Sequence, residues 1–275
     1  MSPTLSDLAL LRWYVEMGAD EAIASAPRGG PAPVPEPVVA PIPETPAPPE
    51  MPPAAMPRVS SPPVAVPAAS PAVTPAAAAS LAELEAAVRA FEGCALKRTA
   101  TNTVFADGVP GAPLMIIGEA PGADEDRIGR PFVGRSGQLL DRMLAAIGFS
   151  RASDAYITNV LFWRPPGNRK PTGDEIAQCL PFVWRHIALG RPRLLMLSGG
   201  TATAALLARG EGITRLRGRW FDLAVPGLAA PVPTLATYHP SFLLRSPARK
   251  GEAWRDLLAL EARFRVAPEI PITDK

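Results

Sequence analysis

Four short, mostly apolar runs with the length of strands constrain the fold more than any other feature of this chain. Residues 114–117 are apolar at every position, which is typical of a parallel strand covered on both faces. Three further apolar runs lie near residues 155–160, 193–198 and 232–238. Helices are predicted between and after the runs, at residues 136–147, 174–189, 201–208 and 251–266. Strands that alternate with helices predict an α/β fold, with a parallel sheet between two helical layers.

Proline separates an N-terminal region from the predicted folded domain. Of the 35 prolines, 18 lie between residues 27 and 75, mixed with alanine and valine. No periodic apolar face can form in such a stretch, so residues 26–79 are predicted to be a disordered Pro/Ala-rich linker. Ser80 and Glu83 then form a capping box that opens a helix. Residues 80–275 are predicted to be one domain, because their number is ample for a buried core.

Residues 1–25 contain a candidate amphipathic helix, with Leu8, Leu11 and either Tyr14 or Val15 on one face. The long linker separates this helix from the domain. It is therefore predicted either to dock back on the domain or to bind a protein partner in a groove, and the sequence does not identify that partner.

Composition limits the setting in which the chain works. No apolar run is long enough to span a bilayer, no signal peptide is recognisable, and two cysteines far apart in sequence indicate a reducing cytosol. A cytoplasmic protein is therefore predicted. The net charge of +2 is nearly neutral, but basic residues are concentrated in the later part of the domain. They indicate either a surface that binds phosphates or an ordinary set of solvent-exposed charges. These residues are Arg164, Arg169, Lys170, Arg215, Arg217, Arg219, Arg245, Arg249 and Lys250.

Three segments place polar groups just past an apolar run, at residues 118–137, 159–171 and 238–245. The carboxyl edge of a parallel sheet is where open α/β folds bind ligands. In order and approximate spacing, these segments resemble the motifs of the uracil-DNA glycosylase superfamily, and specifically of its family 4, over residues 81–265. The resemblance implies a three-layer αβα sandwich around four parallel strands. It also implies a monomer that hydrolyses the N-glycosidic bond of deoxyuridine in DNA and leaves an abasic site.

The resemblance assigns three side chains to the extruded base. The amide of Asn159 matches the O4 and N3–H edge of uracil, although an Asx turn is the ordinary reason for asparagine at a strand end. Phe132 matches the aromatic residue that stacks on the base. His239, in Tyr238-His-Pro-Ser241, matches the donor to uracil O2 as charge builds on the departing base. The predicted substrate pocket contains Gly118, Ala120, Phe132, Asn159 and His239.

The acidic loop after the first apolar run offers two candidate catalytic carboxylates. Ala120 stands where the best-known branch of the superfamily has its water-orienting aspartate, so the resemblance does not assign that role. Glu119 is a candidate near the sugar or the base, where a carboxylate stabilises an oxocarbenium-like transition state or orients water. Glu125 is a candidate near the C5 edge, where it would disfavour the methyl group of thymine. Asp124 and Asp126 are predicted to be solvated loop charges.

Backbone amides at a predicted helix start and a rigid basic turn offer contacts to DNA phosphates. Ser241 and the residues after it are expected to reach phosphates and the minor groove. The predicted DNA-binding residues are Arg135, Ser136, Gly137, Arg164, Asn168, Arg169, Lys170, Ser241 and Arg245.

The cysteines depart from the family pattern. Family 4 proteins usually hold a [4Fe–4S] cluster on four thiolates, and the matching positions here are Phe91, Cys94, Trp163 and Cys179. With two ligands replaced by aromatic residues that would fill the vacated volume, no cluster, no other cofactor and no metal site are predicted.

Other functions remain compatible with the sequence. One is a glycosylase for another deaminated base such as hypoxanthine. A second is a low-turnover uracil-DNA-binding protein, although residues 212–220 lack the additional histidine of a related self-trapping subgroup. A third is a scaffold in which the N-terminal helix matters more than the pocket.

Overall fold

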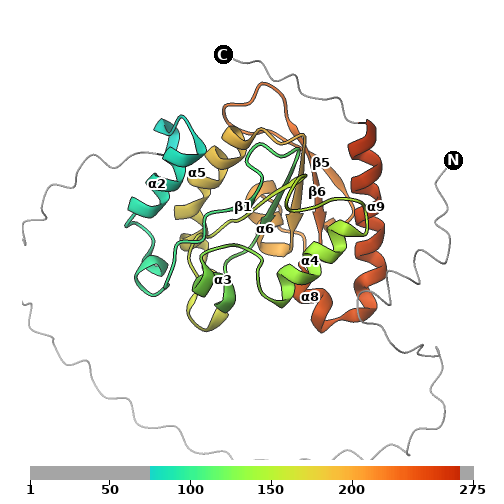
Figure 1. Cartoon of the computed structure of the whole chain (residues 1–275), viewed down its shortest axis with the longest axis horizontal. Coiled ribbons are helices and arrows are strands. Elements are labelled where there is room, and N and C mark those ends of the chain that lie inside the picture. Colours follow the sequence, from blue (N-terminus) through green and yellow to red (C-terminus); the bar gives the residue numbers. More distant parts are fainter. Residues whose placement is uncertain (1–74, 267–275) are drawn as a thin grey trace, which may run out of the picture. The chain divides into compact units, whose positions relative to one another are not determined.

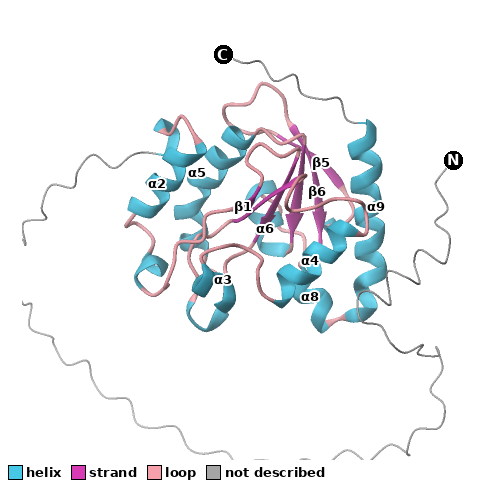
Figure 2. Ribbon diagram, viewed as in Figure 1, coloured by secondary structure: helices cyan, strands magenta, loops and turns pink. Residues whose placement is uncertain are grey.

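The computed structural model describes residues 75–266. The predicted N-terminal helix and most of the predicted linker lie outside the described residues. Within residues 75–266 the sheet has six strands in the order β1-β3-β2-β4-β6-β5. Figure 2 draws the strands in magenta and the helices in cyan. The strands are β1 (Asp107–Gly108), β2 (Leu114–Gly118), β3 (Ala155–Asn159), β4 (Leu194–Ser198), β5 (Trp220–Leu223) and β6 (Val232–Thr237).

The four predicted parallel strands form the centre of this sheet. β3, β2, β4 and β6 pair in parallel, which confirms the sandwich predicted from the sequence. β1 and β5 add antiparallel edges that the sequence pattern did not indicate. β1 has only two residues, and β5 is partly exposed rather than continuously buried, so neither produces a long apolar run.

Helices cover both faces of the sheet (Figure 1). One face carries α2 (Leu81–Ala90), α5 (Gly173–Gly190) and α6 (Gly200–Leu207). The other carries α4 (Arg135–Ala145), α8 (Pro240–Arg245) and α9 (Lys250–Val266). The shorter helices are α3 (Ala123–Ile128), α7 (Ile213–Leu216) and four 3₁₀ turns, η1 (Pro75–Ala77), η2 (Ala95–Arg98), η3 (Pro166–Asn168) and η4 (Pro247–Arg249). No helix among residues 75–266 is long and apolar enough to cross a membrane.

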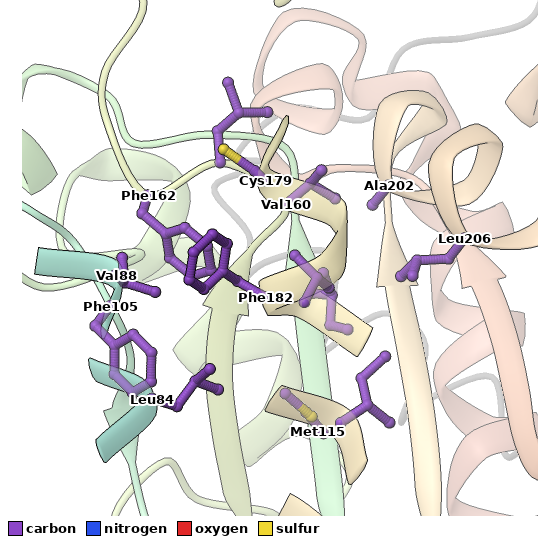
Figure 3. Packing of buried hydrophobic residues seen from close by; sticks show 14 of the residues in the cluster. Leu84, Val88, Phe105, Met115, Val160, Phe162, Cys179, Phe182, Ala202 and Leu206 are labelled. Carbon is purple, nitrogen blue, oxygen red and sulfur yellow. The ribbon is translucent and has the colours of Figure 1, made fainter. Parts of the chain in front are cut away.

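Successive residues of β2 contribute to the two different cores. Met115 and Ile117 belong to the cluster that includes Phe182 of α5, which Figure 3 shows beside Phe162. Leu114 and Ile116 belong to the cluster on the opposite face. Burial of an aliphatic side chain of this kind stabilises a fold by about 1.5–3 kcal/mol. The continuous apolar run is therefore explained by two covered faces, and the sheet holds the ends of its strands in fixed positions.

The folded domain begins earlier than predicted. Ala78, which was assigned to the linker, is fully buried, and its carbonyl accepts hydrogen bonds from Nε (2.8 Å) and Nη2 (2.5 Å) of Arg185. The predicted capping contact is present, with the N–H of Glu83 donating to Ser80 Oγ at 3.2 Å. The apolar alanines next to the cap pack on α5 instead of continuing the linker.

The acidic loop contains the short helix α3, and one of its charges is not solvated. Asp126 is 6% exposed, and its Oδ1 accepts the backbone N–H groups of Thr101 (2.8 Å) and Asn102 (3.0 Å). The prediction of a solvated Asp126 is therefore wrong, because its partners lie more than twenty residues away in sequence. Asp124 is exposed, as predicted. Gly129 ends α3 with φ of 81°, a left-handed conformation that glycine adopts without strain.

Candidate active site

A cavity of about 660 Å³ lies at the carboxyl ends of the parallel strands. Glu119 follows β2, Asn159 ends β3, Ser198 ends β4 and His239 follows β6, and all four line the cavity. The chain places β3 on one side of β2 and the next strand, β4, on the other side. Such a switch point is where open parallel sheets bind their ligands.

The side-chain oxygen of Asn159 has no hydrogen-bond partner in the part of the chain that the structure describes. The residue is 1% exposed, and its Oδ1 accepts no hydrogen bond from residues 75–266. Gly118 lies beside it in the register of β2 and β3, where a Cβ would stand 2.4 Å from Oδ1 of Asn159 and 2.5 Å from Cζ of Phe132. Position 118 therefore has to be glycine for both side chains to approach. An unpaired buried acceptor is costly, and an N–H from a ligand would satisfy it.

Phe132 has an unusual backbone conformation. Its φ is 53°, in the left-handed region, and the side chain is 5% exposed although it lines the cavity. The ring centroid lies 5.3 Å from that of His239, with the two planes tilted by 32°. Gly137 packs against the Phe132 backbone so closely that a Cβ there would lie 1.8 Å from the Phe132 carbonyl oxygen. Gly137 is thus explained by this packing, and it does not line the cavity.

His239 caps α8 with its own side chain. The backbone N–H of Ser241 donates to Nδ1 at 3.1 Å, and Oγ of Ser241 lies 2.8 Å from the same nitrogen. Removal from water, aided by the charge of Arg245, lowers the pKa of His239 to about 4. The imidazole is therefore neutral at pH 7. Because Nδ1 accepts a backbone hydrogen bond, the ring proton resides on Nε2, which is the donor available to a ligand.

Glu119 is oriented by a residue that the sequence pattern did not single out. Oγ1 of Thr201, in the first turn of α6, donates a short hydrogen bond to Oε2 of Glu119. A helix N-terminus also favours a negative charge nearby. Ser198, at the end of β4, lines the cavity with a buried hydroxyl that has no partner among residues 75–266. The available signal was position, because Ser198 and Thr201 lie at or just past the end of the third apolar run, as Glu119 and Asn159 do for the first two.

Glu125 holds the loop between α3 and α4. Its carboxylate accepts backbone N–H groups from Gly122 (3.1 Å), just before α3, and from Val133 (2.9 Å) and Gly134 (2.8 Å), just before α4. The residue also lines the cavity. Its predicted position near the C5 edge of the base stays a prediction, and in the free protein its hydrogen bonds stabilise the loop that carries Phe132.

The predicted DNA contacts divide into two groups. Those that line the cavity are Arg135, Ser136, Asn168, Arg169, Ser241 and Arg245, and Ala120 lines it with them. Arg164 and Lys170 do not line it. Arg169 forms a two-pronged ion pair with Glu175, with N–O distances of 2.9 and 2.5 Å, and this pairing lowers the pKa of Glu175 to about 2. Arg135 and Arg245 are exposed and form no ion pair with any residue in 75–266.

The comparison with known families matches this architecture. Residues 105–258, more than half of the chain, match the family described as the uracil DNA glycosylase superfamily. The chain belongs to this superfamily. The matched residues include β2, β3, β4 and β6, with the four cavity residues at their ends.

Within the superfamily, the chain is similar to proteins named type-4 uracil-DNA glycosylase. The protein from Pyrobaculum aerophilum is 38% identical over 181 residues, which cover 64% of this chain and 91% of that protein. The protein from Sulfurisphaera tokodaii is 34% identical over 200 residues, covering 71% and 87%. The protein from Thermotoga maritima is 38% identical over 172 residues, covering 62% and 85%. These relatives confirm the family 4 resemblance drawn from the three motifs.

This family membership corrects the prediction about cofactors. The type-4 uracil-DNA glycosylases are iron–sulfur enzymes, so a flat prediction of no cofactor is wrong for a chain this similar to them. The four positions do not fit a cluster with four thiolates, because Phe91 stacks on Trp163 with centroids 6.4 Å apart. No group of three or more potential metal ligands occurs among residues 75–266. Any cluster in this chain therefore has two cysteine thiols available at these positions instead of four.

The two cysteines interact with each other. Both are buried and free, and a hydrogen bond from the thiol of Cys179 lowers the pKa of Cys94 to about 7. The same bond, followed by burial, raises the pKa of Cys179. Together with Phe91 and Trp163 they form a packed group, called here the cysteine region.

Proposed function

We propose that this protein is a uracil-DNA glycosylase, which hydrolyses the N-glycosidic bond of deoxyuridine in DNA and leaves an abasic site for base excision repair. The names of its relatives support this activity. The observation that carries it within the structure is the buried Oδ1 of Asn159, which has no partner among the described residues. Uracil N3–H is the matching donor, and the amide N–H₂ of Asn159 is the matching donor for uracil O4.

The base reaches Asn159 only after it leaves the DNA stack. In the proposed complex the flipped uracil lies on the ring of Phe132, and Nε2–H of His239 donates to uracil O2. Negative charge builds on that oxygen as the glycosidic bond breaks, so a fixed neutral donor stabilises the transition state more than the ground state. The lowered pKa of His239 supports this role, because the neutral ring keeps a single donor in a single place.

Positive charge develops on the sugar during the same step. In this proposal Glu119 stabilises that charge or orients the attacking water, and Thr201 fixes its carboxylate by donating to Oε2. Of the two candidate carboxylates, Glu119 is favoured because the oxygens of Glu125 already accept three backbone N–H groups. Glu125 is then proposed to shape the loop around the C5 edge of the base.

The DNA backbone is proposed to lie along the rim of the cavity. Arg135 and Arg245 are the cations proposed to contact phosphates, with Ser136 at the start of α4 and Ser241 at the start of α8. The proposed enzyme acts as a monomer in the cytoplasm. Its N-terminal segment is proposed to recruit a protein partner, and deletion of residues 1–74, which keeps the buried Ala78 and its contact with Arg185, would leave cleavage of short oligonucleotides unchanged.

A strand-cleavage assay tests the proposed activity. A labelled oligonucleotide with one deoxyuridine is incubated with the protein and then treated with hot alkali, beside oligonucleotides that contain hypoxanthine or a thymine mismatch. Cleavage is expected at uracil, and Asn159→Ala is expected to lower the rate by about 10²–10³-fold. Gln178→Ala, which removes an exposed amide on α5, serves as the control. Cleavage at hypoxanthine alone, or binding without cleavage at any base, would overturn the proposal.

A further inference from the structure

Arg151 contacts the backbone of Phe132 from outside the cavity. It lies in the turn between α4 and β3 and is absent from the residues that line the cavity. Its Nη2 donates to the carbonyl of Phe132 at 2.6 Å, and its Nη1 donates to the carbonyl of Pro131 at 2.9 Å. One guanidinium therefore binds two successive carbonyls next to the proposed stacking ring.

The guanidinium of Arg151 is itself held on two sides. Nη1 pairs with Oδ2 of Asp107 at 2.8 Å, and Nε pairs with Oδ1 of Asp141 at 3.0 Å. The Arg151 side chain is 17% exposed. An arginine fork has a rigid planar geometry, so two carboxylates that fix its plane also fix the direction of its remaining donors.

Phe132 needs such support because of its conformation. A φ of 53° places a bulky L-residue in a region that phenylalanine rarely occupies. The position of its carbonyl is limited on one side by Gly137, where a Cβ would lie 1.8 Å from the oxygen. Its ring is limited by Gly118, where a Cβ would lie 2.5 Å from Cζ. The ring can face the cavity only while the 131–132 peptide units keep this orientation.

We propose that Arg151 is a positioning residue for recognition of the flipped base, acting through Phe132. Asp107 and Asp141 hold the guanidinium of Arg151, an arrangement called here the clamp. The guanidinium in turn holds the carbonyls of Pro131 and Phe132, and this keeps the Phe132 ring where a base can stack on it. Loss of the clamp weakens binding of the extruded base and leaves binding of undamaged DNA unchanged, because Arg151 does not line the cavity. This inference rests on the proposed function, since it needs a base that stacks on Phe132.

Binding measurements with a double-mutant cycle test the inference. The probe is a DNA duplex with one 2′-fluorinated deoxyuridine that resists hydrolysis, and the reference is the same duplex with thymidine. Selectivity is the ratio of the two dissociation constants, measured for wild type, Arg151→Met, Phe132→Ala and the double variant. Arg130→Met is the matched control, because this exposed arginine also pairs with Asp107, at 3.8 Å, whereas the carbonyls of Pro131 and Phe132 are bound by Arg151.

Arg151→Met is expected to lower selectivity by about 10- to 100-fold, the range that loss of one base–aromatic stack covers, and Arg130→Met is expected to change it little. In the Phe132→Ala background, Arg151→Met is expected to have no further effect. A general loss of structure would lower selectivity equally in both backgrounds, and that result would overturn the inference, as would an unchanged Arg151→Met. A wild-type protein that neither cleaves uracil-DNA nor prefers the probe would overturn the proposed function itself.

Discussion

The cavity and the cysteine region differ in whether their buried polar side-chain atoms have hydrogen-bond partners among the described residues. In the cavity, Oδ1 of Asn159 and Oγ of Ser198 are buried without a partner among the described residues. In the cysteine region, Nε1 of Trp163 donates to Oγ1 of Thr103 at 3.0 Å, and the ring packs against Phe91. This difference suggests that the cysteine region contributes mainly to the stability of the fold and the cavity mainly to the reaction. Substitutions in the cysteine region are expected to lower the free energy of unfolding, whereas substitutions in the cavity are expected to lower the rate of base excision.

The largest effect on stability is expected from Trp163→Ala. The side chain is 1% exposed, so its removal leaves a large cavity and unfolding is expected to become easier by about 3–5 kcal/mol. Urea denaturation measures this change. Excision per folded molecule is expected to be unchanged, because Trp163 does not line the cavity. Trp163→Phe, which keeps most of the volume, is the control. Equal stability of wild type and Trp163→Ala would show that the region is not packed as described.

His239→Ala is expected to produce the largest kinetic effect after changes at Asn159. Loss of the Nε2–H donor is expected to lower the single-turnover rate of uracil release by about 10²-fold or more. Binding of undamaged DNA is expected to change little. Single-turnover kinetics and a binding titration separate the two quantities. If the rate and the affinity for undamaged DNA fell together, His239 would be a DNA contact and not a transition-state donor.

The buried residue His186 also predicts how the stability of the fold depends on pH. Burial lowers the pKa of His186 to about 3, and the ring stacks on Phe105 with its Nε2 3.0 Å from the hydroxyl of Tyr156. Below pH 6.5 the unfolded chain binds a proton at this residue and the folded chain does not, so the free energy of unfolding falls as pH falls from 6.5 towards 3.

This pH effect can be isolated with His186→Phe. A buried histidine contributes half of about 1.4 kcal/mol per pH unit at pH 6.5 and nearly all of it by pH 5, so wild type is expected to lose about 1.6 kcal/mol more than the variant between these pH values. Thermal or urea unfolding at both pH values measures the difference. Identical losses in the two proteins would mean that His186 is not held neutral in the fold.

The smallest effect is expected from Glu175→Gln. Arg169 is nearly half exposed, so solvent screens the ion pair, and its loss is expected to cost about 0.5–1 kcal/mol at pH 7. Because Arg169 lowers the pKa of Glu175 to about 2, this stabilisation is present above the unfolded pKa near 4.3 and is lost as pH falls towards 2. The difference between wild type and variant, measured by urea unfolding, is expected to vanish over that range. A difference that persists at pH 2 would exclude the charge of Glu175 as its source.

The parts of the molecule that depend on neighbouring residues could be predicted from the sequence. The apolar run at 114–117 indicated a buried strand, and the polar residues just after the parallel strands were expected at one edge of the sheet. Asn159 and His239 were predicted as site residues from this position together with the family resemblance, and both line the cavity.

The contacts that could not be predicted join residues far apart in the chain. Thr201 binds Glu119 across 82 positions, and Asp126 binds Asn102 across 24. The left-handed conformation of Phe132 is equally invisible in its sequence, because it depends on the space left at Gly137 and on the contact with Arg151. Such features arise from packing between elements, which no local pattern records.

The most direct test of the separation between stability and chemistry is Asn159→Leu. Leucine has a similar volume and lacks the buried oxygen, which has no partner among residues 75–266, so the variant is expected to unfold at the same or a higher urea concentration than wild type. Its single-turnover rate of uracil release is expected to fall by at least about 10²-fold. A variant that is clearly less stable and still excises uracil at the wild-type rate would show that Asn159 belongs to the fold and not to recognition of the base.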